Sequence, residues 1–189
     1  MKLRLLDRDD TLLRASDLSG SEVAPDVLRA FLVGAPAPDA IGHRVVHGGP
    51  AYDRPAVLDE AVERGIDELT ALAPLHQPPT LAGIRTAREA LPHPPAVACF
   101  DTAFHARMPP AAASYALPAD WMARWPLRRY GFHGLSHAHA ARRAALLLGR
   151  PAAGLRLVTA TSAPAPRSRP SGTCARSTRR WASRRWRAS

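Results

Sequence analysis

Two charged residues lie in or directly after apolar stretches, and one of them, an arginine, has a side chain that suits the binding of an anion. Asp101 directly follows the apolar run Ala96–Phe100, and Arg44 lies in the stretch Ala40–Val46, shortly before a pair of glycines. A guanidinium is a planar fork of donors that matches a carboxylate or a phosphoryl group. Open α/β sheets bind their ligands at the carboxyl ends of the strands. Arg44 is therefore suited to grip such an anion, with a surface arginine at a strand end as the alternative. Asp101 stands where a ligand would bind, with a helix or turn cap as its alternative.

A third candidate, His133, is flanked closely by Gly131 and Gly134, which allow the backbone to approach a ligand. A metal site is the competing interpretation, because His133 and His137 are four residues apart and His139 follows. Two imidazoles at that spacing can share one face of a helix. There is no Glu-x-x-His pattern and no third ligand at an obvious spacing, so metal binding is disfavoured.

Strands that alternate with helices are expected to position these residues. Short apolar or β-branched runs predict strands at residues 2–7, 40–46, 96–100 and 155–159. Helices are expected over residues 58–72, after a cap at Thr80, and from Ser136 to Gly149. The apolar residues at helical spacing in these three segments are Val62, Ile66 and Leu69, then Leu81, Ile84 and Leu91, then Ala140, Ala144, Leu147 and Leu148. This alternation indicates an α/β architecture.

The positive charge of the chain is concentrated at its carboxyl end. The formal net charge is +10, but residues 160–189 contain eight arginines and no acidic residue, which leaves only +2 for residues 1–159. The basic segment could contact RNA or DNA, with Trp181 and Trp186 available for stacking on bases. A small α/β module with such a nucleic-acid-binding tail is therefore the alternative function.

The compartment expected from the sequence is the cytoplasm. Cys99 and Cys174 form no disulfide framework and fit a reducing environment. Residues 1–10 carry too many charges for a signal peptide, and no apolar run approaches the roughly 20 residues of a membrane span. We expect no membrane partner.

Four segments, in this order, resemble the acetate kinase family, which includes acetate and propionate kinases. They are Gly42–Gly49, Leu72–Pro78, Phe100–His105 and Arg129–His137, and the similarity extends over residues 2–159. The resemblance implies the reaction of ATP with acetate, or another short carboxylic acid, to give ADP and acetyl phosphate. It also implies a homodimer and part of the fold shared by actin, sugar kinases and the Hsp70 ATPase, namely the first domain and the start of the second.

The resemblance also assigns roles to individual residues. Asp101 and His133 match catalytic residues, whereas Arg44 and His76 match residues that bind the substrate. Lys2 matches a lysine close to ATP. Three residues match the apolar pocket for the methyl group of the acid: Val46, Leu75 and Phe132. Because such a pocket discriminates by only about 1–3 kcal/mol per methylene, acetate, propionate and butyrate all stay open as substrates.

The family also binds Mg²⁺ with its ATP, but its metal ligands and most of its nucleotide-binding segments match nothing in this chain. In the family, a motif Asp-Thr-Thr-Met-Gly-Phe-Thr-Pro-Leu-Glu-Gly-Leu-Met follows further downstream. Written in GC-rich codons and read one base later, this motif can be translated as Arg179–Ser189. We therefore expect residues 1–159 to be acetate-kinase-like and residues 160–189 to be an out-of-frame, disordered tail. The chain as written is expected to be a truncated, inactive form.

Overall fold

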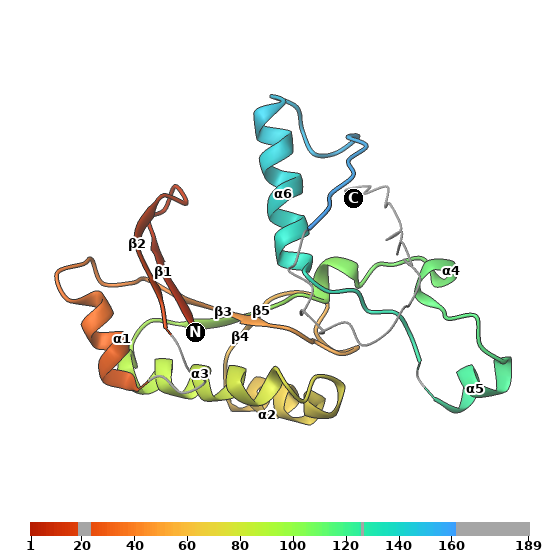
Figure 1. The fold of residues 1–189 in the computed structure, drawn as a ribbon, viewed down its shortest axis with the longest axis horizontal. Helices are drawn as coiled ribbons and strands as arrows, with labels where there is room; N and C mark the ends of the chain where they lie inside the picture. The colour runs from red at the N-terminus through yellow and green to blue at the C-terminus, as the bar shows by residue number, and fades with distance from the viewer. Residues whose placement is uncertain (19–23, 126, 162–189) are drawn as a thin grey trace, which may run out of the picture. The chain divides into compact units, whose positions relative to one another are not determined.

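The computed structural model of the chain describes residues 1–18, 24–125 and 127–161. The expectations for residues 162–189, including the out-of-frame and nucleic-acid-binding interpretations, lie outside the described residues. The chain divides into two compact units, Met1–Gly134 and Leu135–Ser189, which are described separately. The first unit contains both sheets (Figure 1).

A three-stranded sheet lies at the centre of the first unit. Its strands are β3 (Ile41–Val45), β5 (Ala96–Phe100) and β4 (Ala56–Val57), in the order β3-β5-β4. β3 and β5 are parallel, whereas β4 pairs with β5 in the antiparallel sense. The strands predicted at residues 40–46 and 96–100 are confirmed. Because β3 and β5 are parallel neighbours, the residues that follow them meet at one edge of the sheet.

Two helices lie along one face of this sheet, α2 (Glu60–Glu68) and α3 (Gln77–Ala90), with a 3₁₀ turn at Leu69–Leu72 between them (Figure 1). The buried core joins strand and helix residues: Val45, Ile66, Leu81, Ile84, Ala98 and Phe100. Asp59 caps α2 by accepting a hydrogen bond from the Val62 N–H at 2.8 Å. The helix predicted over residues 58–72 is confirmed at Glu60–Glu68 and continues to Leu72 as the 3₁₀ turn.

The predicted cap at Thr80 is wrong, because α3 already begins at Gln77. Two prolines occupy the first turn of this helix, where the missing N–H groups would have no partner within the helix anyway. The Thr80 hydroxyl lies inside the helix and donates to the His76 carbonyl at 2.8 Å. The helix therefore starts directly after His76, which becomes its N-cap residue.

A hairpin and a short helix complete the amino-terminal part. The predicted first strand is β1 (Lys2–Leu6), which pairs with β2 (Leu12–Asp17) in a separate sheet. Helix α1 (Pro25–Leu32) contributes Leu28 to a second apolar cluster. The other members of this cluster are Ala90, Met1, Leu3, Leu18 and Leu91.

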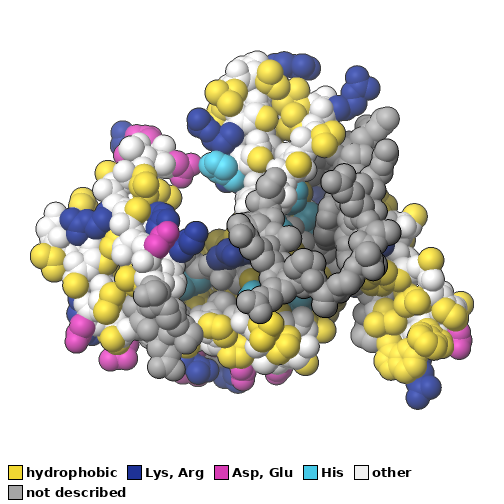
Figure 2. All heavy atoms as spheres, viewed as in Figure 1, with side chains coloured by type: hydrophobic (Ala, Val, Ile, Leu, Met, Phe, Trp, Pro, Cys, Tyr) yellow, Lys and Arg dark blue, Asp and Glu magenta, His cyan; other side chains and the backbone are white. Residues whose placement is uncertain are grey.

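Short helical segments follow β5: η2 (Ala103–His105), α4 (Pro110–Ala113) and α5 (Ala119–Arg124). The region of α5 carries a surface of exposed apolar side chains (Figure 2). Trp121 and Trp125 lie there edge to face, with ring centroids 5.8 Å apart. The other exposed members are Tyr115, Leu117 and Leu127.

Two predictions at the carboxyl-terminal end of the described residues need correction. α6 (Gly134–Leu147) starts two residues before the predicted Ser136, and its Leu147 is exposed, whereas Ala145 is buried. The strand predicted at residues 155–159 is wrong, because this segment has no regular secondary structure. An apolar run becomes a strand only where a second strand pairs with it, and no strand described here does so.

Candidate functional site

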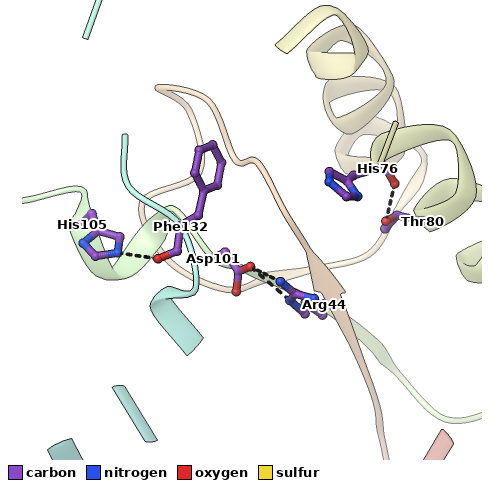
Figure 3. A network of polar contacts seen from close by, with 6 residues as sticks. All are labelled: Arg44, His76, Thr80, Asp101, His105 and Phe132. Carbon is purple, nitrogen blue, oxygen red and sulfur yellow. Dashed lines mark hydrogen bonds and ion pairs between the residues drawn. The ribbon is translucent and has the colours of Figure 1, made fainter. Parts of the chain in front are cut away.

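Arg44 and Asp101 form an ion pair at the edge where β3 and β5 end. The Arg44 Nη2 and Nε atoms both donate to the Asp101 Oδ2, at 2.6 and 3.1 Å (Figure 3). The Asp101 side chain is 1% exposed, whereas that of Arg44 is 57% exposed. The buried carboxylate thus holds one side of an exposed guanidinium, whose remaining N–H groups can receive an anion.

Backbone and side-chain hydrogen bonds join the two loops that carry this pair. The Asp101 N–H donates to the Val45 carbonyl at 2.9 Å and so extends the parallel ladder by one residue. The Gly48 N–H donates to the buried Thr102 hydroxyl at 2.9 Å. A side chain at Gly48 would place its Cβ 2.8 Å from the Tyr52 carbonyl oxygen, so only glycine fits this approach. The loops are therefore held as one unit.

The segment that contains His133 packs against Asp101. A Cβ on Gly134 would collide with the Asp101 carbonyl oxygen, so the absence of a side chain lets the two backbones meet. The preceding Phe132 carbonyl accepts a hydrogen bond from His105 Nε2 at 3.1 Å (Figure 3). His133 has a φ of 58°, in the left-handed region that non-glycine residues rarely adopt. Its imidazole is exposed.

The structure leaves some expected site residues outside this network. His76 and Leu75 lie exposed before α3, and His76 contacts Thr80 only through its carbonyl. In Figure 3 the Arg44–Asp101 pair lies between His76 on one side and His105 with Phe132 on the other. Lys2 lies in β1 opposite Asp17, and no hydrogen bond or ion pair joins it to Arg44 or Asp101. Its role beside ATP stays a prediction.

Four residues that the sequence interpretation did not assign hold the site together. The Thr102 hydroxyl accepts the hydrogen bond from the Gly48 N–H, and His105 donates the hydrogen bond to the Phe132 carbonyl. His47 is 3% exposed and Gln77 is fully buried, and the Gln77 Nε2 donates to the His47 carbonyl at 3.1 Å. All four lie inside the segments with family resemblance, so their position next to assigned residues was the only available signal.

A cavity of about 200 Å³ lies beside the pair rather than at it. Its walls come from the loops after β3 and β5 and from the segment before His133, and they include Gly49, Thr102, Arg107, Arg128 and Tyr130. None of the predicted substrate-binding residues lines this cavity. The expected acid pocket is therefore not this cavity.

The described residues offer no ligand set for Mg²⁺. In that part of the chain, no group of three or more His, Cys, Asp or Glu side chains is arranged to hold a metal ion. His137 Nδ1 instead lies within hydrogen-bond distance of the Thr159 hydroxyl, at 2.8 Å. Among the same residues, no helix is long and apolar enough to cross a bilayer.

Two histidines make the stability of the chain depend on pH. Burial lowers the pKa of His47 and, together with the charge of Arg88, that of His43 below the ordinary value of 6.5. The unfolded chain therefore binds more protons below pH 6.5, so the free energy of unfolding falls as the pH drops toward the lowered pKa values. Urea unfolding from about pH 7.5 to about pH 5 measures this slope.

The variant His43→Gln is expected to show a shallower slope, because one of the two groups has been removed. His93→Gln, at an exposed histidine, serves as the matched control and should keep the slope of the parent. An unchanged slope in His43→Gln would contradict the prediction.

Comparisons with known proteins identify the family of the chain. The family model of the acetokinase family matches residues 35–162. The chain is 57% identical over 119 residues to acetate kinase from Synechococcus sp. (strain JA-2-3B'a(2-13)), covering 63% of this chain and 29% of that protein. It is 50% identical over 121 residues to acetate kinase from Methanosarcina thermophila, covering 64% and 30%.

Solved structures give the same result for the fold. Acetate kinase from Porphyromonas gingivalis superimposes with a TM-score of 0.64 at 31% identity, covering 83% of this chain and 42% of that one. A propionate kinase from Francisella tularensis subsp. tularensis SCHU S4 gives 0.59 at 39% identity, covering 66% and 33%. The mixed α/β architecture is thus part of the actin-like fold of these kinases, and the chain spans about 30% of the length of the relatives it matches. The chain belongs to the acetokinase family.

Proposed function

We propose that this chain forms the acid-binding side of a kinase that transfers the γ-phosphoryl group of ATP to acetate or another short carboxylic acid. The observation that carries the proposal is the Arg44–Asp101 pair, in which a buried carboxylate presents an exposed guanidinium at the end of two parallel strands. Phosphoryl transfer depends chiefly on positioning and on positive charge near the moving group. Arg44 supplies both.

The chemistry assigns no base to the protein. An acetate carboxylate has lost its proton well below pH 7, as model carboxyl groups with pKa values of about 4 do. One of its oxygens attacks the γ-phosphorus, the bond from that phosphorus to the bridging β–γ oxygen breaks, and ADP leaves with the electron pair. Asp101 therefore acts by holding Arg44, and His133 can donate a hydrogen bond to the transferring phosphoryl group.

The wider consequences of family membership are part of the same proposal. The acid's methyl group would lie among Val46, Leu75 and Phe132, and Lys2 would lie close to ATP. The complete enzyme would use Mg²⁺ with ATP, work in the cytoplasm and form a homodimer. The stretch 160–189 would be an out-of-frame extension of the acetate-kinase-like part. Sequencing the gene tests this last point, because one restored base near codon 159 should open a longer frame.

A chimera tests the proposed activity. Residues 35–162 of this chain, the stretch matched by the family, replace the equivalent stretch of the Synechococcus acetate kinase. We expect the chimera to form acetyl phosphate, measured as the hydroxamate, with a turnover on the order of 10 per second. The 189-residue chain assayed alone should form none, because we assign it the acid side only. A chimera that folds but forms no acetyl phosphate would contradict the proposal.

A further inference from the structure

His47 lies at the junction of three segments that carry the predicted acid pocket. It directly follows Val46 in the chain, and its side chain is buried in the loop after β3. His47 contacts its own loop, the segment that carries Phe132 and the start of α3. These contacts connect the three backbone segments that carry Val46, Leu75 and Phe132.

The first contact fixes the imidazole within its own loop. The Gly49 N–H donates to the His47 Nδ1 at 2.9 Å. Because Nδ1 accepts this bond, the ring proton lies on Nε2 and the imidazole is neutral. The ring is thereby held in one orientation relative to the Gly48–Gly49 turn.

The second contact is with the segment that precedes His133. The His47 ring meets the Phe132 ring edge to face, with centroids 5.7 Å apart and planes at 64°, and it meets the Tyr130 ring at 4.5 Å and 62°. Aromatic rings favour these distances and angles. Phe132 is 41% exposed, and the edge of the His47 ring packs against its ring.

The third contact reaches the start of α3. The His47 carbonyl accepts a hydrogen bond from Gln77 Nε2, which also donates to the Ile66 carbonyl at 3.3 Å. Gln77 is fully buried and stands two residues after Leu75. His47 therefore ties the backbone that carries Leu75 to the loop that carries Val46.

We propose that His47 is a positioning residue that sets the width of the acid pocket and so the length of acid that the enzyme accepts. This inference rests on the proposed function, because the pocket has meaning only for a carboxylate kinase. Removing the imidazole would free the Phe132 ring to swing toward the vacated volume, and a longer alkyl chain would then fit. One methylene in an apolar pocket changes selectivity by about 10- to 200-fold.

Two variants in the chimera separate the ring from its hydrogen bond. His47→Asn keeps an acceptor for the Gly49 N–H but removes the ring, whereas His47→Phe keeps the ring and loses the acceptor. We expect His47→Asn to shift the ratio of kcat/KM for acetate over propionate by about 10-fold toward propionate. The KM for acetate should rise while the KM for ATP stays that of the parent. His47→Phe should keep the parent's ratio.

His43→Gln is the matched control, because it removes a partly buried histidine of β3 that forms no aromatic pair with the three pocket segments. Its acetate-to-propionate ratio should equal that of the parent. If His47→Asn fails to fold, His47→Gln fills more of the volume, also lacks a ring and carries the same expectation.

The outcomes separate this inference from the proposed function. A parent chimera that phosphorylates no carboxylic acid overturns both. An active parent whose His47→Asn ratio stays within about twofold, or whose His47→Phe ratio shifts as much as that of His47→Asn, overturns this inference alone. In the 189-residue chain, nuclear Overhauser contacts between the His47 and Phe132 rings are expected as a second measurement, and their absence overturns it as well.

Discussion

Replacing Arg44 by alanine in the chimera is expected to lower kcat by about 100-fold or more, while the KM for ATP changes by less than about threefold. The reason is the geometry of the pair. Two donors of Arg44 are held by Asp101, and the rest of the guanidinium is exposed at the strand ends. Its contacts to the phosphoryl group would strengthen as charge shifts in the transition state, so their loss lowers kcat rather than ATP binding.

Three further variants test this assignment. Arg44→Lys keeps the charge but loses the planar fork, so its kcat should lie between those of the parent and Arg44→Ala. Asp101→Asn keeps the shape and removes the charge that holds Arg44, and we expect its kcat to fall by about 10-fold or more. Arg64→Ala, at an exposed arginine of α2, is the control and should leave kcat unchanged. Near-normal turnover in Arg44→Ala would remove the basis of the proposed function.

Local periodicity was sufficient to predict two strands of the central sheet and one helix. The apolar runs at residues 40–46 and 96–100 became β3 and β5, and the spacing of Val62, Ile66 and Leu69 predicted the helical segment that ends at Leu72. Each pattern arises because the apolar residues of a strand or helix lie on one face. In the structure, the apolar faces of the sheet and of α2 pack against each other in the core. Such patterns are visible in the sequence without knowledge of the partner.

The errors occurred where the outcome depended on tertiary context. The second helix was predicted to begin after a cap at Thr80, but prolines are favourable in the first turn of a helix, and α3 begins at Gln77. Leu155–Thr159 has the composition of a strand, but strand formation requires hydrogen bonds to a neighbour. Neither result follows from the local sequence alone.

In the candidate site, too, the residue types could be predicted from the local sequence, whereas their contacts depend on tertiary structure. Arg44, Asp101 and His133 were each identified from the sequence, but the bond between Arg44 and Asp101 joins residues 57 positions apart. That bond depends on the parallel register of β3 and β5, in which Val45 lies opposite Phe100. The roles of His47 and Gln77 were missed for a related reason, because their function is to connect distant segments and no short motif encodes such a connection.

Gly134→Ala is expected to be the most disruptive single substitution in the site. The added Cβ would overlap the Asp101 carbonyl oxygen and come within 2.6 Å of the Phe104 Cβ. Neither atom belongs to a flexible side-chain end, so the backbone at residues 131–134 must move away from Asp101. This movement displaces His133 and Phe132 together. We expect the free energy of unfolding to fall by about 1–3 kcal/mol, as for other overpacked sites, and the chimera to lose most of its activity.

Gly42→Ala supplies the matched comparison for this substitution. Gly42 lies in β3, no atom lies within 4 Å of a Cβ built there, and its φ is not in the left-handed region. Its unfolding free energy should stay within about 1 kcal/mol of the parent's, because alanine fits the strand and restricts the unfolded chain. Urea unfolding of the 189-residue variants and hydroxamate assays of the chimeras measure both effects. If Gly134→Ala matched Gly42→Ala in stability and activity, the close approach of Gly134 to Asp101 could not be what holds His133 in place.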